Sequence, residues 1–329
     1  MWFPPLWSCH APLRRALRSP KIAGQRETYH LVSTVVSRYH RYDEWSQDRD
    51  GLQFSLTSKG EAAFMNLELR LALGAKYKSR SQQARVVTEA WASSNLYCPA
   101  CTSETVTPTK TNAEATDFIC PACRAPYQLK SMQKRMGRRI VDAGYQAMMR
   151  AVSRGEFPHL LVLSYSESLV NDLLLIPSFS LPPSAIEARK PLGLNARRAG
   201  WVGCNILLHA IPLEGRISLV TQGAIVGRDF VRKRFQQSLP LLMVPLKTRG
   251  WALDVLAGLQ SLGKPVLSTQ DAYGLAPELA MLHPENRHVR EKIRQQLQVL
   301  RDLGFLRFVS RGVYELRALS PFPGEASRN

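Results

Sequence analysis

Four of the six cysteines form two closely spaced pairs, Cys98-Pro99-Ala100-Cys101 and Cys120-Pro121-Ala122-Cys123. Four thiolates in two such pairs can close a tetrahedron around Zn²⁺. The alternative is two redox-active or structural pairs without a metal. We expect zinc bound by Cys98, Cys101, Cys120 and Cys123. Four sulfur ligands leave no open position for water, so the expected role is structural.

A second set of chemically capable residues lies beside the second cysteine pair. Asp117 precedes the pair, and Gln128-Leu129-Lys130 follows it. An acid on one strand and an acidic-x-Lys trio on the next form the pattern of PD-(D/E)xK nucleases. Phosphodiester hydrolysis needs a divalent metal to neutralise the phosphate and lower the pKa of a water. The pattern favours Mg²⁺ held by Asp117, Gln128 and the Leu129 carbonyl, with Lys130 orienting the water, since alternation places residues 128 and 130 on one sheet face.

The middle position of this trio departs from the nuclease pattern. Gln128 stands where an acid is expected, and an uncharged amide oxygen binds a hard cation more weakly. Glu89, on the preceding predicted helix, is a candidate for the missing carboxylate. The trio is short, so an ordinary strand residue followed by a surface lysine is the competing interpretation.

The apolar spacing predicts the elements that would position these residues. Ser81 is expected to cap a helix that places Ala84, Val87 and Trp91 on one face. The predicted elements are, in order, helix 81–94, strands 116–119 and 126–130, a basic helix 138–152 burying Ile140, Tyr145, Met148 and Met149, and strands 159–165, 173–176 and 216–220. This order predicts an α/β layer with a mixed sheet.

A separate pattern follows a proline-flanked linker at residues 240–245. It predicts a helix at 251–262, a short helix capped by Ser268, a long helix at 285–303 ended by Gly304, and a hairpin over 305–316. Three helices and a terminal hairpin indicate a winged helix-turn-helix. The expected divisions are an extension (1–64), a catalytic domain (65–245) with its zinc site at 98–123, the winged helix (246–318) and a tail (319–329).

The charge balance indicates the kind of partner. The 329 residues include 44 Lys and Arg against 26 Asp and Glu, a formal net charge of +18. A surplus of this size attracts a polyanion, and nucleic acid is the leading candidate; the alternative is a generally basic protein. No stretch has the ~18 consecutive apolar residues of a membrane span. The N-terminus lacks the features of a signal peptide. The paired cysteines suit a reducing compartment, and we expect a cytoplasmic protein without a membrane partner.

Several runs resemble the DpnI-like family of methyl-directed restriction endonucleases. They include Ser81-Gln82-Gln83-Ala84-Arg85, Thr88-Glu89, Tyr97-Cys98-Pro99, Asp117-Phe118 and Leu129-Lys130-Ser131, together with 196–205 and 291–298. The resemblance extends from about Met65 to Leu316. We therefore hypothesise that Met65 is the true start and that residues 1–64 are an artefact or a dispensable extension.

The resemblance implies a specific activity. Members of the family have a PD-(D/E)xK domain with an inserted four-cysteine zinc site and a C-terminal winged helix, and they use Mg²⁺ to cut both strands of GATC carrying N6-methyladenine. Asp117 would be the first metal ligand and Lys130 the catalytic lysine, with Gln128 in place of the family's acid. The alternatives are a non-cleaving regulator that binds methylated DNA and a nuclease indifferent to methylation.

The residues expected to read the DNA lie in two segments. The predicted helix 285–303 turns its polar face to the major groove, where Arg suits guanine and Gln suits adenine. Trp201 is a candidate for apolar contact with the methyl group, its alternative being a core position. A monomer is expected to bind double-stranded methylated DNA. The expected contacts are Arg197, Arg198, Trp201, Asn205, Arg290, Glu291, Arg294, Gln295, Gln298 and Arg311.

Overall fold

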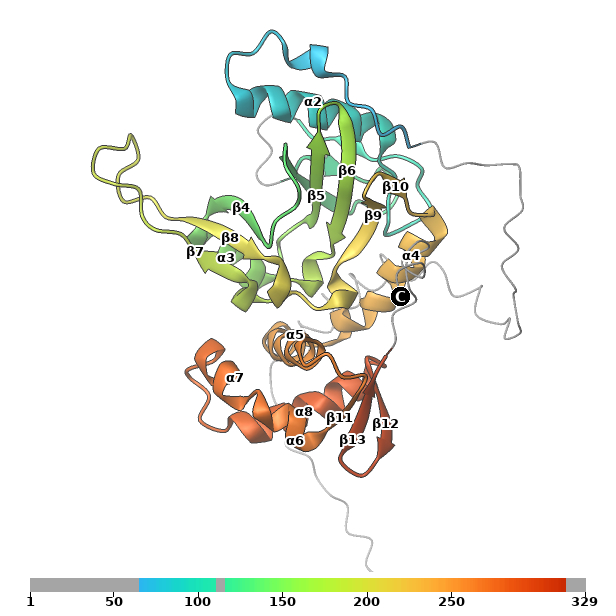
Figure 1. Cartoon of the computed structure of the whole chain (residues 1–329), viewed down its shortest axis with the longest axis vertical. Helices are drawn as coiled ribbons and strands as arrows, with labels where there is room; N and C mark the ends of the chain where they lie inside the picture. Colours follow the sequence, from blue (N-terminus) through green and yellow to red (C-terminus); the bar gives the residue numbers. More distant parts are fainter. Residues whose placement is uncertain (1–64, 111–115, 318–329) are drawn as a thin grey trace, which may run out of the picture.

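The computed structural model describes residues 65–110 and 116–317, which form two lobes (Figure 1). The N-terminal lobe contains a large sheet, a smaller sheet and three α-helices. The C-terminal lobe contains four helices and a three-stranded sheet. The hypotheses on residues 1–64 and on the tail 319–329 lie outside the described residues. Within the described residues, no helix has both the length and the apolar character needed to cross a membrane.

A mixed sheet of seven strands runs through the first lobe of the described chain, in the order β1-β2-β3-β5-β6-β9-β10. Its strands are β1 (Thr107–Pro108), β2 (Phe118–Ile119), β3 (Pro126–Met132), β5 (His159–Ser166), β6 (Leu169–Ile176), β9 (Ile217–Thr221) and β10 (Ala224–Ile225). β3 and β5 are parallel, and the other neighbouring strands in this sheet are antiparallel. The mixed α/β layer predicted from the sequence is confirmed.

Helix α2 (Arg80–Asn95) covers one face of this sheet. Val87 and Trp91 are buried against it, and the hydroxyl of Thr88 lies 3.1 Å from that of Ser131 on β3. The predicted cap was wrong by two residues: the helix begins after Ser79, and Ser81 lies inside its first turn. Alternation along β3 directs Gln128 and Lys130 away from the face that α2 covers.

The predicted basic helix at 138–152 is wrong in its first half. Residues Arg139–Gly144 form strand β4, and α3 (Tyr145–Arg154) begins only after Gly144. β4 is the edge of a second sheet, β4-β8-β7, with β7 at Ile186–Ala188 and β8 at Gly203–Leu207. Its burial alternates, with Ile140 and Asp142 turned inward. Ile140 and Met148 are buried as expected, whereas Tyr145 and Met149 are only half-buried.

The core between the large sheet and α4 contains a buried histidine, which packs against Tyr127 and Phe235. His159 begins β5, is 2 % exposed, and its Nδ1 accepts a hydrogen bond from the Ser178 amide. Burial lowers its pKa to about 4. His159 is therefore neutral in the folded protein, while in the unfolded chain it titrates near pH 6.5.

We expect this histidine to make the first lobe acid-sensitive. Because the unfolded chain binds the proton first, stability is lost as the pH falls from about 6.5 toward 4, by roughly 3 kcal/mol at the lower end. His159→Asn keeps an acceptor near the Nδ1 position but cannot titrate. Melting temperatures of the two proteins at pH 7.5 and 5.5 should show a smaller drop for the variant. An equal drop would assign the sensitivity to other groups.

The C-terminal lobe confirms the predicted winged helix-turn-helix. Its elements are α5 (Leu246–Ser261), β11 (Val266–Ser268), α6 (Thr269–Gly274), α7 (Ala276–Leu282), α8 (Val289–Asp302), β12 (Leu306–Ser310) and β13 (Val313–Leu316). Ser268 caps α6 in a capping box with Asp271, as expected of the serine. α8 begins four residues later than predicted, and Gly304, at φ +77°, follows its end. β11 joins the hairpin as a third strand, which the sequence did not predict.

The two lobes meet along helix α5. α4 (Arg228–Ser238) and a 3₁₀ turn (Leu239–Met243) lead directly into α5. The predicted linker at residues 240–245 is therefore a short, structured connection. Ser184 of the first lobe donates a hydrogen bond to Asp254 on α5, and the other carboxylate oxygen of Asp254 lies 2.7 Å from Nε2 of His283. His283 stacks on Trp251 with ring centroids 3.7 Å apart. The contact between the two lobes therefore includes a hydrogen bond to the buried Asp254 carboxylate of α5.

Candidate active site and zinc centre

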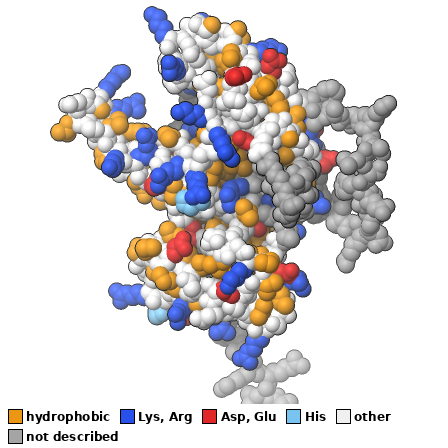
Figure 2. All heavy atoms as spheres, in the orientation of Figure 1, with side chains coloured by type: hydrophobic (Ala, Val, Ile, Leu, Met, Phe, Trp, Pro, Cys, Tyr) orange, Lys and Arg blue, Asp and Glu red, His pale blue; other side chains and the backbone are white. Residues whose placement is uncertain are grey.

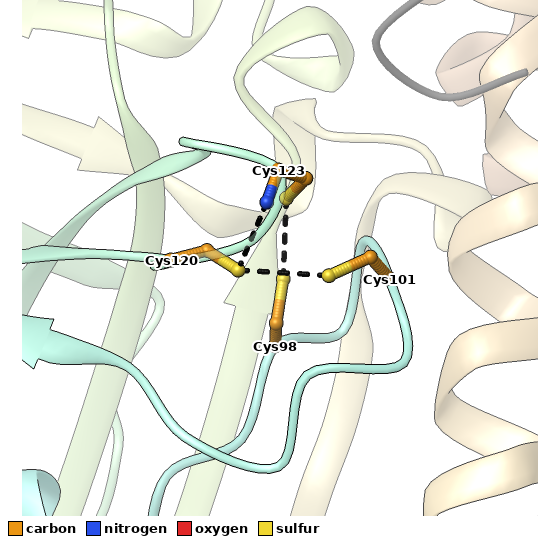
Figure 3. A group of neighbouring side chains, drawn as sticks. All are labelled: Cys98, Cys101, Cys120 and Cys123. Atoms are coloured by element: carbon orange, nitrogen blue, oxygen red, sulfur yellow. Dashed lines mark hydrogen bonds between the residues drawn. The ribbon is translucent and has the colours of Figure 1, made fainter. Parts of the chain in front are cut away.

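The four paired cysteines converge on one point (Figure 3). Their sulfur atoms all lie within 4.8 Å of one another, although the two pairs come from separate loops. The amides of Ser103 and Cys123 point at the sulfurs of Cys101 and Cys120, each at 3.4 Å. A compact set of four sulfurs is the donor set that selects zinc among the common metals. The cluster therefore has the geometry to hold a zinc ion.

The acid–base state of the cluster suits a metal. The hydrogen bond with Cys98 lowers the pKa of Cys123, which favours the thiolate at this sulfur. Cys98 shows the opposite direction, its pKa being raised by the same hydrogen bond and by burial. A bound cation removes this conflict because all four sulfurs can then be thiolates.

The four-cysteine cluster contacts the strand that carries Gln128-Leu129-Lys130. The sulfur of Cys98 lies 3.1 Å from the hydroxyl of Tyr127, which is fully buried on β3 next to Gln128. From the other side, Arg232 on α4 reaches the carbonyls of Cys98 and Ser103. Arg232 also stacks on Tyr97. The cluster thus fixes the position of β3 relative to the surrounding helices.

Asp117 directly precedes β2 and lies beside the part of β3 that β2 does not pair with. Its Oδ2 accepts a hydrogen bond of 2.8 Å from the amide of Leu129, the central residue of the trio. The N–H of a strand residue lies in the plane of the sheet, so the carboxylate occupies the place that a neighbouring strand would take. The Asp117 carboxylate is therefore bound to the residue that lies between Gln128 and Lys130.

Lys130 contacts a carboxylate that sequence reasoning missed. Its Nζ lies 2.5 Å from Oδ1 of Asp142 on β4, and the Asp142 side chain is only 1 % exposed. Gln128 is 8 % exposed, and its Oε1 has no hydrogen-bond partner among the described residues. Oδ2 of Asp142 is likewise buried without a partner in the described part of the chain. Two buried oxygens without a partner, one of them on a carboxylate, are oxygen ligands of the kind that a hard divalent cation takes, so this region fits such an ion.

Glu89 lies elsewhere. Its carboxylate accepts a hydrogen bond of 2.6 Å from Arg85, one turn earlier on α2. The hydrogen bond that Arg85 donates to Glu89, and more weakly the charge of Asp117, raise the pKa of Arg85, so Arg85 lies near both acids. α2 covers the face of β3 opposite Gln128 and Lys130. The structure does not bring Glu89 together with the trio.

Three of the predicted DNA-contacting residues of the first lobe, Arg197, Arg198 and Trp201, lie on a projecting segment between β7 and β8, and Asn205 lies on β8 (Figure 1). Arg197 and Arg198 are exposed there. Trp201 is half-buried, and its ring lies against the backbone of Gly144 and Gly203, where an added Cβ would meet it at 3.5 and 2.9 Å. The amide of Asn205 donates to Glu187. Figure 2 shows Lys and Arg side chains gathered over this arm and the adjoining small sheet.

Helix α8 presents the predicted polar face. Its core face consists of Ile293, Leu297 and Leu300, with Val289 half-buried. The five residues expected to face DNA are all exposed: Arg290, Glu291, Arg294, Gln295 and Gln298. Arg311 is exposed at the turn between β12 and β13.

These features together define a DNA-acting protein with a mixed-sheet lobe, a four-cysteine centre and a helix-turn-helix lobe. Residues 65–243 match the family model described as DpnI, the Dam-replacing family. Residues 247–316 match the model described as DpnI_C, the Dam-replacing HTH domain. The chain belongs to the Dam-replacing family of restriction endonucleases, and it is a DNA-binding nuclease by that membership.

Proposed function

We propose that this protein is a magnesium-dependent endonuclease that cuts both strands of DNA at GATC sites carrying N6-methyladenine. The observation that carries the proposal is that the amide of Leu129, between Gln128 and Lys130, donates to the Asp117 carboxylate, while the buried Oε1 of Gln128 has no partner among the described residues, in a chain of the Dam-replacing family. It is a cytoplasmic type II enzyme in this proposal, with a PD-(D/E)xK catalytic domain over 65–245 and a winged helix over 246–318, acting as a monomer.

Each site residue has a role in this reaction. Asp117, the amide oxygen of Gln128 and the carbonyl of Leu129 would hold the magnesium ion. When bound, the ion neutralises the phosphate and lowers the pKa of the attacking water. Lys130 orients that water and stabilises the charge that develops on the phosphate oxygens. The zinc centre does not take part in the chemistry and holds β3 in place through Tyr127.

Recognition of the methylated base would be shared by the two lobes. The exposed arginines and glutamines of α8 suit guanine and adenine edges in the major groove. Trp201 would contact the N6-methyl group with its exposed edge, and Arg197 and Arg198 would hold the phosphates. Asn205 would reach a base only by giving up its hydrogen bond to Glu187.

A plasmid assay tests this function against its alternatives. Zinc-loaded protein is incubated with Mg²⁺ and the same plasmid in an adenine-methylated and an unmethylated form. We expect cutting of the methylated plasmid only, at GATC. Cutting of neither, with retained binding, would indicate the non-cleaving regulator, for which Gln128 is the favouring feature. Cutting of both would indicate a nuclease indifferent to methylation.

Helix α8 allows a test of binding without cleavage. Arg290→Ala combined with Arg294→Ala should weaken binding of a methylated duplex by about 10- to 100-fold in low salt. If both side chains contact phosphates, the salt dependence of the binding constant should fall by about two ion equivalents. Arg301→Ala is the matched control, because Arg301 lies on the same helix but pairs with Asp302. Binding assays by fluorescence anisotropy without Mg²⁺ measure both, and equal affinity for all three proteins would remove α8 from the interface.

A further inference from the structure

The Asp142 carboxylate uses only one of its two oxygens. Oδ1 accepts hydrogen bonds from Lys130 Nζ at 2.5 Å and from the Ala143 amide at 2.6 Å. Oδ2 is buried and has no partner among the described residues. A carboxylate that served only to pair with Lys130 would leave this oxygen desolvated without compensation, which is costly for a charged group. The geometry indicates a ligand for Oδ2.

The backbone holds Asp142 in this orientation. The ladder between β4 and β8 has an irregularity between Asp142 and Gly144, and Cys204 lies opposite Asp142 in that ladder. The buried Cys204 thiol donates to the Ala143 carbonyl. Rigid backbone on both sides leaves the carboxylate little freedom to turn. Such preorganisation is what a cation site requires.

Gln128 has the complementary deficiency. Its side chain is on the same face of β3 as Lys130, two residues earlier, and its Oε1 is also buried without a partner in the described chain. Asp117 and Gln128 alone supply one negative charge, whereas divalent magnesium is commonly held by one or two carboxylates. Asp142 raises the count to two carboxylates.

We propose that Asp142 is a ligand of the divalent cation through Oδ2 and provides the carboxylate that Gln128 lacks. This inference rests on the proposed nuclease function. In this arrangement Oδ1 positions Lys130 while Oδ2 faces the cation, so one side chain sets the distance between the lysine and the metal. Glu89 cannot fill this place because α2 covers the opposite face of β3.

Manganese binding is the direct test, because it does not depend on turnover. The full-length, zinc-loaded protein is titrated with Mn²⁺ by calorimetry without DNA. Asp142→Asn, which is isosteric and keeps the acceptor for Ala143, should weaken Mn²⁺ binding about 10- to 100-fold. Gln128→Glu should tighten it, and Gln128→Glu combined with Asp142→Asn should return it to near the wild-type value. That rescue distinguishes a cation ligand from a residue that only positions Lys130.

The matched control is Asp172→Asn. Asp172 lies on β6, in the seven-stranded sheet that also contains β3, and both of its oxygens already accept hydrogen bonds, from Ser164 and from the Gln222 amide. It should leave Mn²⁺ affinity unchanged. Zinc content and melting temperature report whether each variant is folded.

Two results would separate the failure of this inference from that of the proposed function. If Asp117→Asn loses Mn²⁺ and Asp142→Asn does not, Asp142 is no ligand while the nuclease proposal stands. If the wild-type protein neither binds Mn²⁺ nor cuts either plasmid, both are wrong. Should Asp142→Asn not fold, wild-type crystals soaked in Mn²⁺ decide: an anomalous peak about 2.0–2.6 Å from Asp142 Oδ2 supports the inference, and a peak out of its reach overturns it.

Discussion

Lys130→Met should reduce cleavage of methylated DNA by about 10³-fold while binding of the same DNA remains. The side chain keeps its length but loses the charge that orients the water and stabilises the phosphate, and groups in such roles contribute about 10²- to 10⁴-fold. Single-turnover cleavage and anisotropy on one protein preparation measure the two quantities separately. Loss of binding with loss of cleavage would place Lys130 in the fold or in the DNA interface.

The ion pair with Asp142 requires a second variant in this experiment. Removing Lys130 leaves a buried carboxylate without its cation, which destabilises proteins by several kcal/mol. Lys130→Arg retains the charge but replaces a compact ammonium by a planar fork, so it should keep the melting temperature and still lose most of the activity. Lys78→Ala, at an exposed lysine before α2, is the control for a general loss of positive charge.

Loss of the zinc centre should unfold the first lobe. Cys120→Ser removes a fully buried ligand, and the sulfur cluster is continuous with the core that contains Tyr127 and Trp91. Structural zinc sites contribute folding free energy outright. We expect the melting temperature to fall by more than about 10 °C and the zinc content to drop below one ion per chain.

Cys204→Ser is the matched control for that variant. Cys204 is equally buried but lies on β8, away from the four-cysteine cluster. It should retain full zinc content by atomic absorption. A Cys120→Ser protein that keeps its melting temperature and its zinc would exclude a structural metal at this site.

The parts of the fold that the sequence predicted well are those governed by local chemistry. The cysteine spacing lets four sulfurs surround a single metal ion, and Ser268 caps α6 through its own neighbours. The long helix α8 was recognisable because its apolar face repeats over several turns. The cysteine cluster, the mixed sheet and the winged helix could therefore all be predicted from the amino-acid sequence.

The error at β4 has a specific physical cause. Ile140, Met148 and Val152 are spaced in multiples of four, so a strand and the helix after it share one helical periodicity. What makes 139–144 a strand is its long-range pairing with β8, which no local signal reveals. Because of this error the sequence did not single out Asp142, since on a helix it would be one more exposed acid. Its ion pair with Lys130 exists only because β4 places Asp142 beside that lysine.

The contact along α5 limits how the two lobes can be recombined. Asp254 bonds to Ser184 of the first lobe and to His283 of the second, so α5 packs against both lobes and is not a flexible linker. A chimaera that grafts a foreign DNA-binding module after residue 245 would remove α5, expose the first-lobe surface that α5 covers and leave Ser184 without its acceptor. Under the proposed recognition by α8, a change of specificity in this scaffold is therefore best made on the outward face of α8 while α5 is left as it is.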